Sequence, residues 1–223
     1  MFSLCMQGEG AMSPAFACGV FAKGMGAAGG DRASMTVLLF DIPPEALPDI
    51  PGLEYLPNFI SAEEERALMK AIDDQPWLDD LKRRIQHYGY KYDYKARAVT
   101  PDSYLGPLPD WLEPVTRKLS FQPDQAIVNE YEPGQGISAH IDCVPCFGGT
   151  IASLSLGSGA VMQFANRNEK QEIYLEPRSL IVLSGEARFR WAHAIPARKA
   201  DMVGGFKIDR SRRLSLTFRT VLT

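Results

Sequence analysis

The sequence predicts a mostly β fold with flanking helices, whose core is a double-stranded β-helix, or jelly roll, of antiparallel strands. Two observations favour this class. From residue 125 onward, short runs rich in β-branched, aliphatic and aromatic residues are separated by turns that contain Gly and Pro, as in β-sandwiches and barrels. Before residue 125, two stretches carry apolar residues at helical spacing. We therefore expect two helices that lead into the strands and pack against them.

The first helix is predicted from residue 61 to residue 74. Ser61 and Glu64 have the spacing of a capping box, and Leu68 and Ile72 fall on one helical face. A second helix is predicted from Pro109 to Ser120, with its apolar side chains directed inward. The strands expected after it are QAIVNEY, TIASLSLG, AVMQFAN, QEIYL, SLIVLSG, ARFRWAHAI and RRLSLTFRTVL.

The 223 residues are enough for one domain with a substantial core. Residues 1–34 are rich in Gly, Ala and Met without a sustained period, so we expect a disordered tail and a single domain over residues 35–223. No apolar run approaches the ~20 residues that cross a bilayer. The short apolar stretch 16–22 has no Lys or Arg before it, which argues against a signal peptide. A cytoplasmic monomer that does not enter membranes is the expectation.

The charges are unevenly distributed along the chain. The formal net charge is −3, and residues 41–80 hold eleven acidic residues against two basic ones. Residues 178–219 hold ten Lys or Arg against three acidic residues. An acidic protein of this kind is able to carry a basic face beside its active site. Charges that are simply scattered and solvated explain the same counts equally well.

Two of the three histidines occur in a pattern typical of a metal site. His140 and Asp142 form an H-x-D motif at the end of a predicted strand, and His193 follows on another predicted strand. Alternate strand residues point the same way, so one ion can receive both side chains of the motif. Two imidazoles and one carboxylate form the facial triad of non-haem iron(II) oxygenases. An isolated H-x-D motif is weak evidence, and a lone histidine is often a core residue. His87 is interpreted as a surface or lid residue rather than a ligand.

The last predicted strand adds a second, more specific feature. In RRLSLTFR, Arg213 and Arg219 fall on one face, and apolar residues fall on the other. Two arginines inside a barrel are costly unless they meet anions there. Guanidinium groups bind carboxylates through paired hydrogen bonds, so a dicarboxylate is the expected ligand. An edge strand with a solvated polar face is the alternative.

Over roughly residues 52–222 the chain resembles the AlkB family of dioxygenases. The motifs that carry the resemblance occur in order: GYKYDY, NEYEPGQGISAHID, SLSLGSGAVMQF, PRSLIVLSGEARFRWAHAI and RRLSLTFR. The resemblance implies a jelly-roll oxygenase that uses Fe(II), 2-oxoglutarate and O2 and releases succinate and CO2. His140, Asp142 and His193 would then bind the iron.

The resemblance also assigns the co-substrate residues. Arg213 would pair with the distal carboxylate of 2-oxoglutarate, assisted by the hydroxyl of Tyr131. Asn129 and Arg219 would lie near its chelating end, where the chemistry takes place. Ser215 falls where many members of the family carry Asn, which weakens one hydrogen bond to the co-substrate and leaves the pair with Arg213 intact.

The segment GYKYDY resembles the nucleotide-recognition lid of the family. Its neighbourhood supplies aromatic rings that could stack on a flipped base and cations that could hold phosphates. The expected substrate residues are Tyr90, Tyr92, Tyr94, Arg83, Arg84 and Arg97. The tyrosines could equally pack a strand pair.

Within the family, the sequence is most similar to the oxygenase domain of the wobble-uridine tRNA hydroxylases. Hydroxylation or oxidative dealkylation of bases in nucleic acid is therefore the expected activity, on single-stranded or alkylated DNA or on tRNA. Two alternatives remain open: a dioxygenase that acts on protein side chains or lipid, and a non-catalytic binding module on the same fold.

Cys143 and Cys146 follow the metal-site motif directly. A structural zinc requires four ligands, and the other two cysteines, Cys5 and Cys18, lie in the tail. Ordinary loop residues are the favoured interpretation of the pair, and a disulfide is a further hypothesis.

Overall fold

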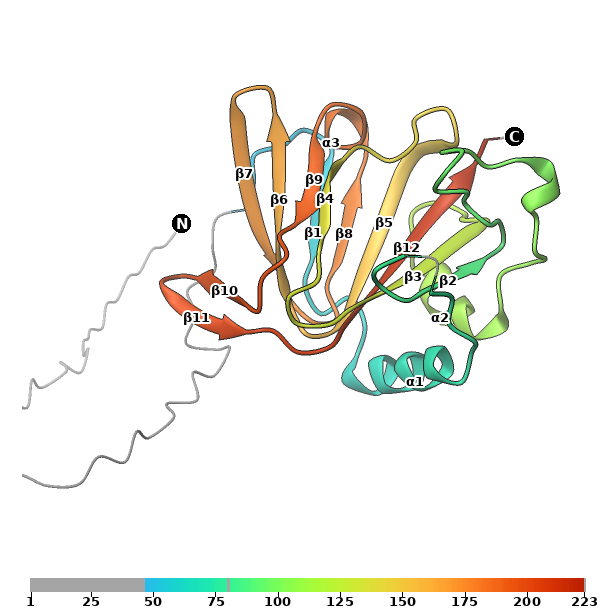
Figure 1. Cartoon of the computed structure of the whole chain (residues 1–223), viewed down its shortest axis with the longest axis horizontal. Coiled ribbons are helices and arrows are strands. Elements are labelled where there is room, and N and C mark those ends of the chain that lie inside the picture. The colour runs from blue at the N-terminus through green and yellow to red at the C-terminus, as the bar shows by residue number, and fades with distance from the viewer. Residues whose placement is uncertain (1–46, 80, 223) are drawn as a thin grey trace, which may run out of the picture. The chain divides into compact units, whose positions relative to one another are not determined.

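A computed structural model describes residues 47–79 and 81–222. The predicted disordered tail, residues 1–34, lies outside the described residues. Two antiparallel sheets dominate the described part (Figure 1). The larger sheet contains, in order, β1 (Leu53–Leu56), β8 (Leu180–Leu183), β5 (Phe147–Gly157), β12 (Arg213–Val221), β3 (Gln125–Tyr131) and β2 (Ile85–Tyr88). The smaller contains β4 (Ile137–His140), β9 (Ala192–Ile195), β6 (Ala160–Asn166) and β7 (Glu169–Leu175). The predicted jelly-roll class is confirmed.

Apolar side chains join the two sheets. Met162 and Phe164 of β6 pack in one buried cluster with Ile181 and Leu183 of β8. Because side chains alternate between the two faces of a strand, the residues between these apolar ones point to the opposite face of their sheet. A separate hairpin, β10 (Ala200–Val203) and β11 (Phe206–Asp209), follows β9.

Helix α1 (Ala62–Asp73) and the short helix that follows it pack against one face of the larger sheet (Figure 1). Helix α1 begins at the predicted capping box: the Glu64 amide donates to Ser61 Oγ at 3.1 Å, and the Ser61 amide donates to the Glu64 carboxylate at 2.7 Å. Leu68 and Ile72 are buried against the sheet. A cap of this type stabilises a helix by about 1 kcal/mol. The burial of Leu68 and Ile72 fixes the position of the helix on the sheet.

The second helix is much shorter than predicted. A single 3-10 turn, Asp110–Leu112, leads into α2, which comprises only Glu113–Thr116. The amides of Lys118 and Leu119 bond to carbonyls three residues earlier, so the chain tightens out of α-helical geometry. Another short 3-10 helix lies at Pro101–Ser103.

Strand β12 has an apolar face toward the helices and a polar face toward the space between the two sheets. Its residues Leu214, Leu216 and Phe218 are fully buried in the cluster that contains α1. Its alternate residues, Arg213 to Arg219, therefore face the space between the two sheets, as the sequence pattern predicts. A shift of one residue would exchange these faces, so the register of β12 is strongly specified.

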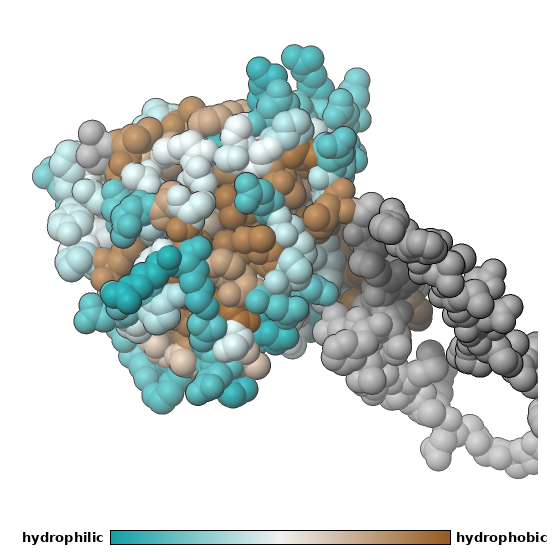
Figure 2. Space-filling view, turned by 180° about the vertical axis from the view of Figure 1, so that it is seen from behind, coloured by the Kyte–Doolittle hydropathy of each residue, from teal (hydrophilic) through white to brown (hydrophobic). Residues whose placement is uncertain are grey.

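The predicted strand ARFRWAHAI is wrong in its first half. Residues Gly185–Phe189 form the short helix α3, and β9 begins only at Ala192. None of the helices in the described part of the chain is long and apolar enough to cross a membrane. Seen from behind, the surface of this part mixes hydrophilic and hydrophobic residues (Figure 2).

Candidate active site

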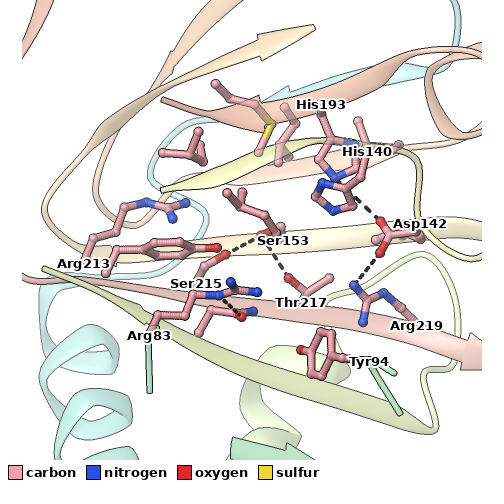
Figure 3. Close-up of a pocket in the computed structure, with 18 residues that line it drawn as sticks. Arg83, Tyr94, His140, Asp142, Ser153, His193, Arg213, Ser215, Thr217 and Arg219 are labelled. Carbon is pink, nitrogen blue, oxygen red and sulfur yellow. Dashed lines mark hydrogen bonds and ion pairs between the residues drawn. The ribbon is translucent and has the colours of Figure 1, made fainter. Parts of the chain in front are cut away.

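The two metal-site histidines come from neighbouring strands. His140 at the end of β4 is paired directly with His193 of β9, and their ring centroids are 4.5 Å apart. Asp142 follows two residues after His140, just beyond the strand. One possible ligand atom from each of the three residues lies within 4.8 Å of the other two. The structure thus brings the predicted triad together (Figure 3).

A glycine allows β4 to approach β9 this closely. A Cβ atom at Gly136 would lie 2.2 Å from the carbonyl oxygen of Ile195. A side chain there would force the strands apart at the point where β4 begins. The Gly-rich turn before the H-x-D motif is therefore part of the metal site's geometry.

A hydrogen bond to the backbone orients the ring of His140. Its Nδ1 lies 2.8 Å from the carbonyl oxygen of Ser138. A carbonyl only accepts, so Nδ1 carries the proton and Nε2 is left with a lone pair for a metal. Such a bond from the second ring nitrogen is usual for metal-binding histidines.

The buried groups hold the protonation states that a metal ligand needs. Burial lowers the pKa of His193 to about 4, although the carboxylate of Asp142 lies 3.7 Å away. Burial alone would raise the pKa of Asp142, but the positive charge of Arg219 and its neighbours outweighs this, and the pKa falls to about 2. Arg219 donates from Nη2 to Asp142 Oδ1 at 2.6 Å. At neutral pH the site offers a neutral imidazole and a carboxylate.

A cavity between the sheets adjoins the triad, and Arg213 lies in it (Figure 3). Its side chain is buried, with one hydrogen bond from Nη2 to Ser155 Oγ at 2.8 Å and no partner for Nε. Burial lowers the pKa of Arg213 to about 10, which leaves it charged at neutral pH. Among the described residues no carboxylate forms an ion pair with it. A buried unpaired cation is costly, so this site fits an anionic ligand.

The other predicted co-substrate residues line the same cavity. They are Asn129, Tyr131, Ser215 and Arg219. The Arg213 guanidinium lies over the Tyr131 ring, with Cζ 5.5 Å from its centroid. Ser215 Oγ is 2.9 Å from Ser153 Oγ, so the hydroxyl found where Asn is common bonds to the neighbouring strand.

The donor set fits iron(II). Two histidines and one carboxylate on one side of an ion leave three positions for ligands from solution. The buried cation of Arg213, which has no ion-pair partner among the described residues, would hold a carboxylate of 2-oxoglutarate beside them. Bound together, iron(II), 2-oxoglutarate and O2 supply an oxidant that converts a C–H bond into C–OH, with succinate and CO2 as the other products.

Comparisons with known proteins agree with this geometry. A family model described as the 2OG-Fe(II) oxygenase superfamily matches residues 78–219. An Arabidopsis thaliana protein named alkylated DNA repair protein ALKBH8 homolog is 38% identical over 78% of this chain and 59% of its own length. The Macaca fascicularis tRNA (carboxymethyluridine(34)-5-O)-methyltransferase ALKBH8 is 41% identical over 73% of this chain and 26% of its own. The chain thus spans less than two thirds of these relatives.

This chain belongs to the AlkB family of iron(II)- and 2-oxoglutarate-dependent dioxygenases. A solved structure of OsALKBH1 shares the fold, with a TM-score of 0.58, 19% identity, and coverage of 80% of this chain and 100% of that one. The predicted enzyme class and cofactors are confirmed.

The structure divides the six predicted substrate residues of this AlkB protein. A second cavity opens beside His140 and Asp142. Four of the six line it: Arg83, Tyr92, Tyr94 and Arg97. Tyr92 and Tyr94 pack edge to face, with ring centroids 5.0 Å apart. The cavity walls thus combine aromatic rings and cations directly beside the metal site.

The other two predicted substrate residues point elsewhere. Arg84 pairs with Glu130 through two hydrogen bonds and lies over the ring of Trp77. Tyr90 packs against Tyr104, with ring centroids 4.9 Å apart. Neither lines the cavity, because each is held by a partner that the local sequence pattern does not reveal.

His87 was expected at the surface or in the lid, and the structure places it inside. It lies in β2, is 9% exposed, and packs its ring against Tyr94. It takes no part in the triad, as predicted.

Arg188 is a functional residue that the sequence pattern did not single out. Its side chain is almost completely buried and donates to four backbone carbonyls, two in the loop that follows β4 and two at the start of β5. The acceptors are Asp142 at 3.0 Å, Cys143 at 3.2 Å, Gly148 at 3.3 Å and Phe147 at 3.4 Å. Arg188 thereby fixes the loop that carries the metal-site carboxylate. The sequence pattern predicts a strand at Arg188, whereas it lies in helix α3, so its contact with these carbonyls could not be predicted.

Cys143 and Cys146 form a disulfide. The favoured interpretation of the pair as ordinary loop residues is therefore wrong, and the disulfide hypothesis agrees with the structure. Both sulfurs approach the carbonyl of Arg97, at 3.4 and 3.6 Å. The pair thus lies between the metal-binding loop and the segment that carries the substrate-cavity tyrosines.

Proposed function

We propose that this dioxygenase hydroxylates or oxidatively dealkylates a base in single-stranded nucleic acid, with tRNA as the first candidate. The observation that carries the proposal is the cavity lined by Arg83, Tyr92, Tyr94 and Arg97, which opens beside His140 and Asp142. A base placed there lies next to the metal site. No other class of substrate is favoured by a specific feature of the described residues.

The two tyrosines are suited to hold the base. Aromatic stacking contributes roughly 1–3 kcal/mol per base and tolerates any base. Tyr92 also packs against Phe147, with ring centroids 5.7 Å apart, so the ring is supported from behind. Burial raises the pKa of Tyr94, which keeps its hydroxyl neutral and able to donate a hydrogen bond.

The cations around the cavity are suited to the phosphates. Arg97 is exposed, and Lys91 and Lys95 are exposed on either side of Tyr92 and Tyr94. Basic side chains interleaved with aromatic rings are the usual surface for single-stranded nucleic acid. A chain of net charge −3 can bind a polyanion through such a local surface.

The relatives point in the same direction. The Arabidopsis relative is named for alkylated DNA repair, and the macaque relative for a tRNA uridine. The macaque relative's methyltransferase activity is not transferred to this chain, which covers 26% of that protein. What is proposed is the oxygenase step alone.

The test is succinate formation from 2-oxoglutarate in the presence of iron(II) and ascorbate. Bulk tRNA and N-methylated single-stranded DNA oligonucleotides are supplied in parallel, and Asp142→Ala is the inactive control. The proposal expects one nucleic acid to stimulate turnover in the wild type and not in the variant. Tight 2-oxoglutarate binding without stimulation by either nucleic acid would overturn it and favour a protein or lipid substrate.

A further inference from the structure

Arg83 lies between the cavity lined by Tyr92 and Tyr94, proposed above for the base, and the cavity that contains Arg213, proposed for the co-substrate. It lines both cavities. Its Nε donates to Asn129 Oδ1 at 2.8 Å, and its Cζ lies 5.6 Å from the ring centroid of Tyr131. Figure 3 shows its guanidinium directed into the pocket that Arg213 also lines. Arg83 therefore contacts the same two side chains that the family motif assigns to 2-oxoglutarate.

Two guanidinium groups thus share one aromatic ring. Arg213 and Arg83 lie at 5.5 and 5.6 Å from the centroid of Tyr131. Within the described residues, neither forms an ion pair with a carboxylate. Two like charges facing one small cavity repel each other unless negative charge enters between them. A dianion such as 2-oxoglutarate supplies that charge.

The contact with Asn129 orients its amide. A guanidinium carries only donors, so the amide atom that faces Arg83 is the oxygen. The amide nitrogen of Asn129 is then directed away from Arg83 and is available to donate to an anionic ligand. The only hydrogen bond of Arg83 in the described part of the chain is this one, which leaves its Nη groups for a ligand.

The neighbouring residue behaves differently. Arg84 is turned to the other side of the chain, where it pairs with Glu130. Of the two arginines, which both precede β2, only Arg83 lines the cavities. Arg84 is therefore a matched control for Arg83.

We propose that Arg83 is a 2-oxoglutarate-binding residue: its guanidinium bonds the anionic co-substrate and holds Asn129 in the orientation that the co-substrate requires. This assigns Arg83 to the co-substrate site instead of the phosphate-binding surface. The proposal rests on the enzyme class and is independent of the nucleic acid proposed above.

The test is the Kd of 2-oxoglutarate, measured by calorimetry on the full chain loaded with Mn(II), without nucleic acid. Arg83→Gln is expected to raise this Kd by about tenfold or more, as for loss of a hydrogen bond to a charged group. Arg83→Lys keeps the charge and should recover part of the affinity. Arg84→Gln should change the Kd less than twofold. Mn(II) affinity and thermal midpoint, measured on each variant, report whether the site is intact.

Steady-state kinetics separate binding of the co-substrate from binding of nucleic acid. Arg83→Gln should raise KM for 2-oxoglutarate and leave KM for the nucleic acid near the wild-type value, whereas Arg97→Gln should do the reverse. An unchanged 2-oxoglutarate Kd in Arg83→Gln would overturn the proposal and return Arg83 to phosphate binding. Should Arg83→Gln fail to fold, an equal Kd for Arg83→Lys and wild type would overturn it as well. Because calorimetry uses no nucleic acid, its outcome does not depend on whether nucleic acid is the substrate.

Discussion

His140 and His193 face each other across the β4–β9 ladder, with ring centroids 4.5 Å apart, although 53 residues separate them in the sequence. Direct pairing of two strands fixes both imidazoles at once. Asp142 then needs only the two-residue extension beyond β4 to complete the triad. The metal site is thus carried on rigid strands on one side and on a loop, held by Arg188, on the other.

The first prediction concerns the metal. His193→Ala is expected to weaken Mn(II) or Fe(II) binding by roughly 100-fold or more, since loss of outer-shell partners alone costs 10–100-fold. Calorimetry with Mn(II) measures this directly. His87→Ala, which removes a buried histidine outside the triad, should leave the metal affinity within a factor of two. Equal losses in both variants would argue against the triad as the metal site.

The sequence predicted the site largely because its signals are periodic. Alternation along RRLSLTFR assigned Arg213 to the barrel interior and Leu214 to the core, and the structure agrees. The H-x-D spacing and a later histidine on an expected strand predicted the three residues that the structure brings together. Each of these patterns lies within one short segment, so it can be recognised in the sequence without knowledge of the fold.

What the sequence did not predict depends on contacts between distant residues. Arg84 turns away from the cavity because Glu130, on another strand, accepts its hydrogen bonds. Arg188 binds a loop about 45 residues earlier in the chain. No spacing within either segment distinguishes these arginines from their neighbours Arg83 and Arg190.

Arg213 provides a prediction in which affinity and stability separate. Arg213→Met removes a buried, unpaired cation, so 2-oxoglutarate affinity should fall by about two orders of magnitude. The thermal midpoint of the protein without co-substrate should not fall, because replacing a buried uncompensated charge with an apolar side chain is neutral or stabilising. Calorimetry and thermal unfolding measure the two quantities.

Arg210→Met is the matched control for that experiment. Arg210 is also buried, but it pairs with the buried carboxylate of Asp201 at 2.6 Å. Removing it leaves Arg198 as the remaining ion-pair partner of that carboxylate and should destabilise the fold by about 1.5–3 kcal/mol, as for loss of a hydrogen bond to a charged group. Arg210→Met should therefore lower the thermal midpoint, whereas Arg213→Met should not. A loss of stability in Arg213→Met equal to that in Arg210→Met would show that Arg213 is a structural cation.

Arg188 should affect both stability and metal binding. Arg188→Met removes the donors to four backbone carbonyls of the loop after β4 and the start of β5, and unsatisfied buried acceptors cost about 1–3 kcal/mol each. We expect a destabilisation of at least about 3 kcal/mol and weaker Mn(II) binding in the molecules that remain folded. Arg190→Met removes only an exposed pair with Glu186 and should change stability by less than about 1 kcal/mol. Normal metal affinity in Arg188→Met would limit its role to folding.

The cysteine pair gives the last prediction. The chain has four cysteines, and a bond between Cys143 and Cys146 leaves at most two free thiols in protein unfolded without reductant. Reduction before unfolding should restore four. Cys143→Ser should give three thiols in both conditions if the remaining cysteines are unpaired. Because the pair lies against the Arg97 carbonyl, reduction is expected to change KM for the nucleic acid more than KM for 2-oxoglutarate. Four thiols without reductant would show that the pair is reduced in the isolated protein, and KM values that do not respond to reductant would show that it does not control the substrate cavity.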